Sequence, residues 1–182
     1  WLPYVVKAKQ VITDFIEGRE DDLLKITTIS QYLSNLDNFF RSGRYNPNFK
    51  HNEAINRMLI ELIERIPLSQ FIEQNPKEIH LNPVLSIPTL NADADIILGN
   101  TLIDIKTVKD NTFSQSHLYQ LGAYYALITK TKNIKIDNIG IYFSRHGQLM
   151  IYPTHEIFQS PENMATNFMK LANHKSPGLN YY

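Results

Sequence analysis

The spacing of apolar residues predicts helices in the first third of the chain. Apolar side chains recur every three or four residues in three successive segments, which is the spacing of a helix that buries one face. A glycine follows each of the first two segments and can end the helix in a left-handed conformation, and a proline follows the third. The predicted helices are one that ends before Gly18, one that begins at Thr27 or Thr28 and ends at Gly43, and one over 48–65, before Pro67.

From about residue 77 the pattern changes to alternation of apolar and polar positions, which is typical of strands. We expect strands over 79–87, 92–98, 101–108, 136–144 and 149–152. Pro83 either kinks the first strand or places it at an edge of the sheet. Helical spacing returns over 113–130 and 156–172. This order of elements predicts an α/β or α+β fold in which helices flank a central mixed sheet.

The length and composition predict one globular unit. The 182 residues are 43% hydrophobic, which is enough for one sizeable core. We expect residues 1–47 to form an N-terminal helical extension packed on a core over 48–176. The chain starts at Trp1 rather than at a methionine, which suggests a piece of a longer protein.

Two features of the composition restrict the function and the location. The chain has no cysteine, which excludes disulfides, thiolate-held zinc and cysteine nucleophiles and is typical of a cytoplasmic, intracellular protein. No uncharged apolar run approaches the roughly 20 residues of a membrane span, so we expect no membrane association.

The charge balance favours a local nucleic-acid groove over non-specific coating of nucleic acid. The chain carries 18 basic and 18 acidic side chains, whereas proteins that bind nucleic acid by charge alone are usually strongly basic. The segment 41–50 combines basic and aromatic residues and directly precedes the third predicted helix. We therefore predict that Arg41, Arg44 and Lys50 contact backbone phosphates.

Residues 92–107 predict a tight hairpin with charged side chains on one face. Gly99 and Asn100 separate two alternating runs, which is typical of a two-residue turn with glycine at positive φ. Such a turn sets Leu98 opposite Thr101, and the other pairs follow by counting along both strands. The predicted pairs are Asp95 with Asp104 and Asp93 with Lys106, all four on one face, while Ile96, Ile103 and Ile105 point into the core.

Two carboxylates directly opposite each other predict a cation site. Their Cβ atoms would lie about 4.5–5.5 Å apart, where like charges are destabilising. A divalent cation that bridges Asp95 and Asp104 removes this repulsion, and Mg²⁺ or Mn²⁺ suits carboxylate oxygens. Lys106 on the same face would orient a water molecule or stabilise developing negative charge. A solvent-facing hairpin with incidental charges is the alternative.

An acid in a strand, a short hairpin and then Asp-Ile-Lys-Thr resembles the signature of the PD-(D/E)xK nuclease superfamily. The resemblance covers about Phe49 to Pro153, and the predicted order of helix, three strands, helix and strand matches the common core of that family. It implies a restriction-endonuclease-like fold. The family's proline before the first acid is absent here, since Ala94 precedes Asp95. The implied roles are metal binding by Asp95, Asp104 and the backbone carbonyl of Ile105, and catalysis by Lys106.

The segment after the hairpin resembles the RecB-like branch of the superfamily, through Gln-Leu-x-x-Tyr at 120–124. The resemblance implies that Gln120 acts at the active site, where it contacts the substrate phosphate or positions Lys106. Tyr124 follows one helical turn later and would contact nucleic acid; alternatively, both residues border the packed face. We expect His117 to be a packing or capping residue.

The family often adds a third acid or a histidine to the metal site, from the helix before the strands. Glu53 is the preferred candidate in this chain and His51 the alternative. An acid in the first turn of a helix also interacts favourably with the helix dipole, without any role in metal binding.

Together these features predict an enzyme, a Mg²⁺- or Mn²⁺-dependent nuclease that hydrolyses phosphodiester bonds, with DNA as the expected nucleic-acid partner. The alternative is a catalytically silent domain of the same fold that binds nucleic acid or protein within a larger assembly. A homodimer, or membership of a larger protein or complex, fits either function.

Overall fold

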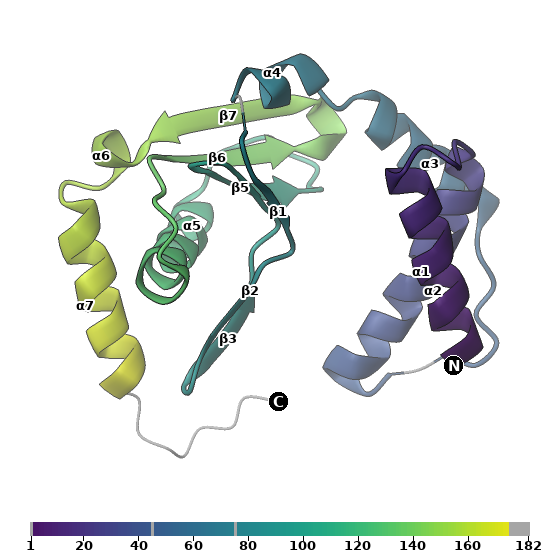
Figure 1. Cartoon of the computed structure of the whole chain (residues 1–182), viewed down its shortest axis with the longest axis horizontal. Coiled ribbons are helices and arrows are strands. Elements are labelled where there is room, and N and C mark those ends of the chain that lie inside the picture. The colour runs from purple at the N-terminus through teal and green to yellow at the C-terminus, as the bar shows by residue number, and fades with distance from the viewer. Residues whose placement is uncertain (1, 45, 75, 175–182) are drawn as a thin grey trace. The chain divides into compact units, whose positions relative to one another are not determined.

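The chain forms two compact units, one up to Glu64 and one from Arg65 onward (Figure 1). The structure is a computed structural model that describes residues 2–44, 46–74 and 76–174. The sequence predicts the boundary of the helical extension between residues 47 and 48. In the structure the third helix belongs to the N-terminal unit.

The N-terminal unit contains three helices, and α2 packs against both α1 and α3. Their bounds are Leu2–Ile16 for α1, Leu23–Ser42 for α2 and Glu53–Glu64 for α3. Gly18 and Gly43 adopt the left-handed conformation after α1 and α2, with φ of 70° and 68°, as the sequence predicted.

The predicted start of α2 at Thr27 or Thr28 is wrong, because Asp22 caps the helix instead. Its carboxylate accepts hydrogen bonds from the backbone N–H groups of Leu24 at 2.9 Å and Lys25 at 3.2 Å. Thr27 lies inside the helix and its hydroxyl donates to the carbonyl of Leu23 at 2.8 Å. Asp22 is therefore the residue that determines where α2 begins.

A buried polar network joins α2 to α3. Asn56 is fully buried, and its side-chain oxygen accepts a hydrogen bond from Gln31 Nε2 at 2.6 Å. Its Nδ2 donates to the hydroxyl of Thr28 at 2.8 Å. Asn52 caps α3 by accepting from the backbone N–H of Ala54 at 2.8 Å, which explains why the helix begins at Glu53 rather than near residue 48.

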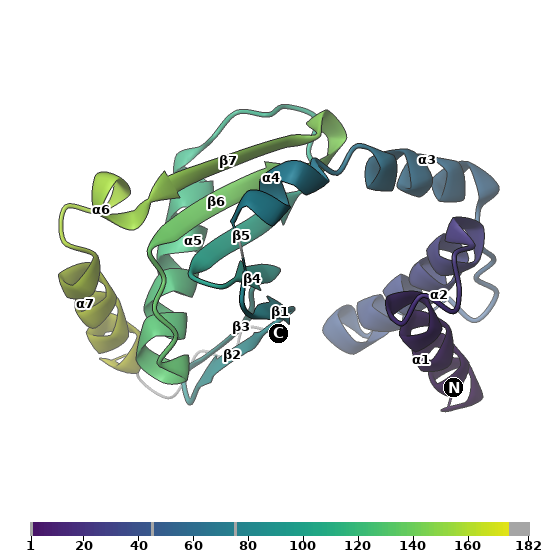
Figure 2. The ribbon, with the colours of Figure 1, turned by 45° about the horizontal axis from the view of Figure 1, so that its top comes forward.

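The C-terminal unit is built around a five-stranded mixed sheet with the order β1-β4-β5-β6-β7 (Figure 2). Strands β5 and β6 are parallel and the other neighbouring pairs are antiparallel. The bounds are Ile79–Leu81 for β1, Ile96–Leu98 for β4, Thr101–Lys106 for β5, Asn138–Phe143 for β6 and Gln148–Pro153 for β7. The fold is therefore mixed α/β, with helices that flank a central mixed sheet, as predicted.

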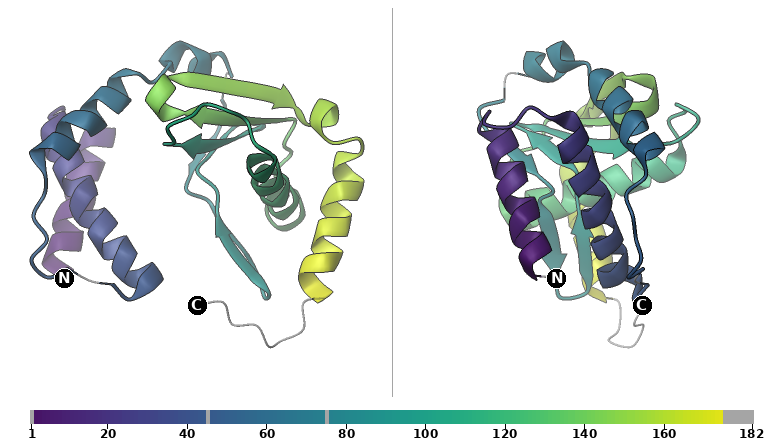
Figure 3. Two further views of the ribbon diagram at one scale, coloured as in Figure 1. Left: turned by 180° about the vertical axis from the view of Figure 1, so that it is seen from behind. Right: turned by 90° about the vertical axis from the view of Figure 1, so that its right-hand side faces the viewer.

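One face of this sheet is covered by helix α5, and the main core lies between them (Figure 3). Helix α5, Gln115–Leu127, continues into a π-helical turn over Ile128–Lys132, and α7, Pro161–His174, packs against α5. The buried side chains of this core include Leu102, Leu121 and Ile141.

A smaller core lies on the opposite face of the sheet. Leu98, Ile103 and Tyr142 are buried there and pack with Phe71 of the short helix α4, Leu68–Glu73. The described part of the chain contains no helix with the length and apolarity needed to cross a bilayer.

Three predicted elements are divided in the structure. The strand predicted over 79–87 is β1 plus β2, Val84–Ile87, and the latter pairs with β3, Leu90–Asp93, in a separate two-stranded sheet. The strand predicted over 92–98 is correspondingly divided into β3 and β4. The break coincides with Pro83, which lacks a backbone donor, and with Asn82 at a φ of 47°. The last predicted helix is divided into α6, Thr154–Ile157, and α7, which begins at Pro161.

Candidate active site

The predicted hairpin between β4 and β5 is present. Gly99 has a φ of 55°, and Leu98 pairs with Thr101, Ile97 with Leu102 and Ile96 with Ile103. The register inferred from the turn is therefore confirmed along the whole of β4. It places Asp104 on the same face of β5 as buried Leu102, which is the face that α5 covers.

The strand pairing ends at Ile96, and the residue before it, Asp95, contacts β5 through its side chain instead of its backbone. The carboxylate oxygen Oδ2 of Asp95 accepts a hydrogen bond from the backbone N–H of Ile105 at 2.6 Å. This contact fixes Asp95 beside the chain that carries Asp104. The two acids thus lie close enough for the charge of Asp95 to raise the pKa of Asp104.

Asp95 and Asp104 do not form the predicted strand pair, because β4 begins only at Ile96. Two further predictions from the hairpin register are also wrong. Asp93 does not face Lys106 but pairs with Val84. The reason is that β3, which contains Asp93, belongs to the two-stranded sheet, and the chain joins the larger sheet only at β4. Ile105 was predicted to point into the core, yet its side chain is 37% exposed near the end of β5. Ile103 is fully buried, as predicted.

Asp104 is a buried carboxylate with a lysine beside it. Its side chain is 3% exposed, and its Oδ2 forms an ion pair at 2.7 Å with Nζ of Lys106. Apart from that ion pair, Oδ2 has no hydrogen-bond partner among the described residues. Loss of hydration raises the pKa of Asp104, and the nearby Asp95 raises it further, while Lys106 and His117 act in the opposite direction.

Lys106 connects Asp104 to helix α5. Its Nζ donates a hydrogen bond to Oε1 of Gln120 at 2.7 Å, and Nε2 of Gln120 donates to the hydroxyl of Tyr124 at 2.7 Å. Gln120 and Tyr124 are both half-buried. The structure thus brings together Asp104, Lys106 and Gln120, with Tyr124 at the end of the chain of hydrogen bonds.

The start of α5 is fixed by a reciprocal cap. Ser114 Oγ accepts from the backbone N–H of His117 at 3.4 Å, and the backbone N–H of Ser114 donates to His117 Nδ1 at 3.3 Å. The ring of His117 also lies edge-on to Phe143, with the ring centroids 6.0 Å apart. His117 is therefore a capping and packing residue, as expected.

A hydroxyl pair behind Lys106 was not predicted from the sequence. Ser144 is buried, and its hydroxyl lies 2.8 Å from that of Thr107 and 3.5 Å from the carbonyl of Lys106. Thr107 directly follows the Asp-x-Lys signature, but no pattern in the sequence indicates that Ser144 lies beside it. The pair fixes the end of β5 to the end of β6.

The donors at this site fit a hard divalent cation. Two carboxylates, from Asp95 and Asp104, lie near the backbone of Ile105, and oxygen is the ligand that Mg²⁺ prefers. The buried Oδ2 of Asp104 has no partner except an ammonium group among the described residues. In that same part of the chain, no three His, Asp or Glu side chains converge on one point. Water or substrate would supply the remaining ligands, as is common for Mg²⁺.

The other predicted site residues lie in the N-terminal unit. Glu53 is exposed in the first turn of α3, and His51 lies beside Tyr32, with ring centroids 6.2 Å apart. Arg41 forms an ion pair with Asp37 at 2.8 Å, and Arg44 and Lys50 are exposed. That Glu53 or His51 completes the metal site, and that the three basic residues contact phosphate, both stay predictions.

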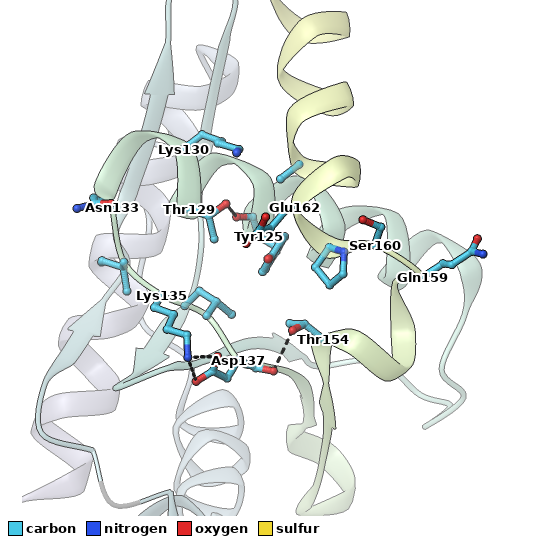
Figure 4. Close-up of a pocket in the computed structure, with 14 residues that line it drawn as sticks. Tyr125, Thr129, Lys130, Asn133, Lys135, Asp137, Thr154, Gln159, Ser160 and Glu162 are labelled. Atoms are coloured by element: carbon cyan, nitrogen blue, oxygen red, sulfur yellow. Dashed lines mark hydrogen bonds and ion pairs between the residues drawn. The ribbon is translucent and has the colours of Figure 1, made fainter.

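The pocket shown in Figure 4 is separate from these residues. It has a volume of about 650 Å³ and lies between the end of α5, the π-helical turn and the start of α7. Its charges balance, because Lys130 and Lys135 are accompanied by Asp137 and Glu162. None of the predicted site residues lines it. The candidate active site is therefore defined by the polar contacts around Asp104 and not by this hollow.

Comparison of the chain with protein-family models, with curated proteins and with solved structures found no match. The similarity to the PD-(D/E)xK nucleases therefore stays a prediction from the sequence pattern.

Proposed function

We propose that this chain is a Mg²⁺- or Mn²⁺-dependent nuclease that hydrolyses phosphodiester bonds in DNA. The observation that supports the proposal most strongly is the contact of buried Asp104 with Lys106, which Gln120 holds from a different element. Removing a carboxylate and an ammonium group from water is costly, and apolar side chains of similar size often stabilise a fold as well or better. The arrangement is thus better explained by chemistry than by stability.

The metal would be held by Asp95, Asp104 and the backbone carbonyl of Ile105. When bound, a divalent cation lowers the pKa of a nearby water molecule and offsets negative charge on the phosphate. Because Asp104 is held between Lys106 and the core, its carboxylate cannot turn away into solvent. Asp95 is similarly fixed by its bond to the N–H of Ile105.

Lys106 would act on the phosphate or on the attacking water. In hydrolysis the water oxygen forms a bond to phosphorus and one phosphorus–oxygen ester bond breaks, leaving one phosphate end and one hydroxyl end. The ammonium group of Lys106 can donate hydrogen bonds to the negative charge that develops in this step. Gln120 accepts one of those hydrogen bonds in the structure and so sets the direction of the others.

A second candidate function is a silent domain of the same fold that binds nucleic acid or protein. One observation favours it: within residues 2–44, 46–74 and 76–174, no third acidic or histidine side chain joins Asp95 and Asp104. The two functions differ in whether the purified chain cleaves nucleic acid.

The decisive experiment compares the wild-type chain with Lys106→Ala on linear, circular and single-stranded DNA and on RNA, with Mg²⁺ or Mn²⁺. We expect cleavage by the wild type and none by the variant, because the side chain of Lys106 contacts the site and not the apolar core. Its loss should lower the rate of the chemical step rather than substrate affinity.

Lys132→Ala, an exposed lysine of the π-helical turn, is the matched control and should cleave like the wild type. Cleavage that persists in Lys106→Ala would reveal a contaminant or another site. A wild-type chain that binds metal but cleaves none of the substrates would favour the silent domain.

A further inference from the structure

We infer that exposed basic residues at the carboxyl ends of β5 and β6 bind the phosphate backbone of the nucleic acid. This cationic rim comprises Lys109 and Arg145. The inference rests on the proposed function and extends it, because it assigns substrate contacts to the same unit that carries Asp104 and Lys106.

The sheet brings the rim next to the candidate active site. Strands β5 and β6 are parallel, and Lys106 lies opposite Phe143 in their register. The chain after Phe143 forms a 3-10 turn over Ser144–His146. The hydroxyl of Ser144 contacts Thr107, the residue that follows Lys106, at 2.8 Å. The turn that carries Arg145 therefore lies against the segment that leaves the site.

Backbone contacts hold the rim in place. Nε2 of His146 lies 3.0 Å from the carbonyl oxygen of Lys109, and Nη1 of Arg65 donates to the carbonyl oxygen of Arg145 at 2.9 Å. These bonds use the main-chain oxygens of Lys109 and Arg145. The long side chains of both residues stay exposed and available to a ligand.

Gly147 shows how closely this turn packs. It has a φ of 60°, and a Cβ at this position would lie 2.8 Å from the carbonyl oxygen of Arg65. Any other residue would therefore push the turn away from Arg65. The distance between Arg65 and the turn is thus set by the backbone, which holds the main chain at Arg145 in place before any ligand binds.

The charges of the rim suit a polyanion. The two segments 107–114 and 144–148 contain Lys109 and Arg145 but only one acid, Asp110. In the part of the chain that the structure describes, no acid pairs with Lys109 or Arg145, whereas Arg41 of the N-terminal unit is paired with Asp37. Arginine and lysine side chains contact phosphates without reading the base sequence. The structure therefore favours a nucleic-acid backbone as the ligand.

The test measures DNA binding by Lys109→Ala/Arg145→Ala. Fluorescence anisotropy with a short labelled duplex, in EDTA so that nothing is cleaved, gives Kd across roughly 50–200 mM KCl. Two lost phosphate contacts should reduce the slope of log Kd against log salt by about two units. Equal melting temperatures would show that the variant is folded.

The matched control is Lys130→Ala/Lys132→Ala. It removes the same charge from the π-helical turn. The exposed lysines of this turn precede β6, whereas the 3-10 turn with Arg145 follows β6. This control should keep the wild-type slope. A slope that falls in the control but not in the rim variant would overturn the inference, because the phosphate contacts would then lie at the π-helical turn.

The outcomes separate the rim from the proposed function. If the wild type cleaves DNA with Mg²⁺ and the rim variant keeps the full slope, the rim is wrong and the nuclease stands. If the wild type binds DNA without cleaving it and the rim variant loses two units of slope, the rim is supported and the nuclease is wrong. If the wild type neither binds nor cleaves DNA, both are overturned.

Discussion

At the scale of single residues, Asp104 is where stability and chemistry conflict. Its carboxylate is buried, and its pKa is raised because it has lost hydration. The sequence could predict that Asp104 and Lys106 share a face, because strand alternation requires it. It could not predict that Asp95 would use one oxygen to bind the N–H of Ile105, because the alternating pattern predicts that the strand pairing continues past Ile96, where it ends in the structure.

Asp104→Asn should raise the melting temperature in EDTA by a few degrees, equivalent to about 1 kcal/mol in a chain of this size. The gain depends on pH. Since the folded-state pKa of Asp104 lies above its unfolded value, the protonated acid favours folding at low pH and ionisation opposes it as pH rises. The advantage of the variant should therefore grow as the pH rises above about 4, which thermal unfolding at a series of pH values measures.

The same variant tests the metal site. Mn²⁺ should raise the melting temperature of the wild type, because it offsets the charges of Asp95 and Asp104, and Asp104→Asn should lose most of that gain. Asp110→Asn removes an exposed acid and should keep the full response to Mn²⁺. An equal rise in the wild type and in Asp104→Asn would place the metal elsewhere.

At the scale of elements, the turn between β4 and β5 was predicted correctly and the strands before it were not. Gly99 and Asn100 specify a tight turn locally, so the register from Leu98 to Ile96 followed from the sequence alone. The alternation over 92–98 carries no information about which sheet a strand joins. The separation of β3 from β4 depends on pairing with Val84 and on the geometry at Pro83, which are tertiary features.

Helix α5 contributes to the site through Gln120, which we expect to be a positioning residue. Gln120→Leu keeps the size of the side chain but removes the oxygen that accepts from Lys106. Cleavage should fall by roughly 10–100-fold, the usual effect of losing a partner that orients an active-site group. The loss should appear in kcat more than in KM, with the melting temperature nearly unchanged.

Tyr124→Phe is the graded control for this prediction. It removes only the hydroxyl that accepts from Gln120 Nε2, so its effect on cleavage should be smaller than that of Gln120→Leu. Steady-state kinetics of both variants measure the difference. Full activity in Gln120→Leu would show that Lys106 needs no support from α5.

At the scale of the whole molecule, the sequence did not indicate that the third helix belongs to the N-terminal unit. Its amphipathic pattern predicted a helix of the core, but the contacts that hold it are polar. Gln31 and Asn56 form a buried hydrogen bond at 2.6 Å, and neither residue type signals burial in a sequence. The predicted ligand Glu53 and the basic loop 41–50 therefore belong to one unit, and Asp104 to the other.

This division makes the predicted basic loop a separate test of substrate binding. Arg41→Ala, Arg44→Ala and Lys50→Ala together should reduce the slope of log Kd against log salt by up to about three units. The exposed ion pair of Arg41 with Asp37 is no obstacle, because such pairs contribute little and a phosphate can replace the carboxylate. Lys7→Ala/Lys9→Ala on α1 controls for general charge loss in the same unit. If the loop and the cationic rim contact different phosphates, a variant that carries both the loop and the rim substitutions should show a reduction in slope equal to the sum of the two separate reductions. If the slope of the loop variant alone is unchanged, the phosphate contacts lie at the rim and not at the loop.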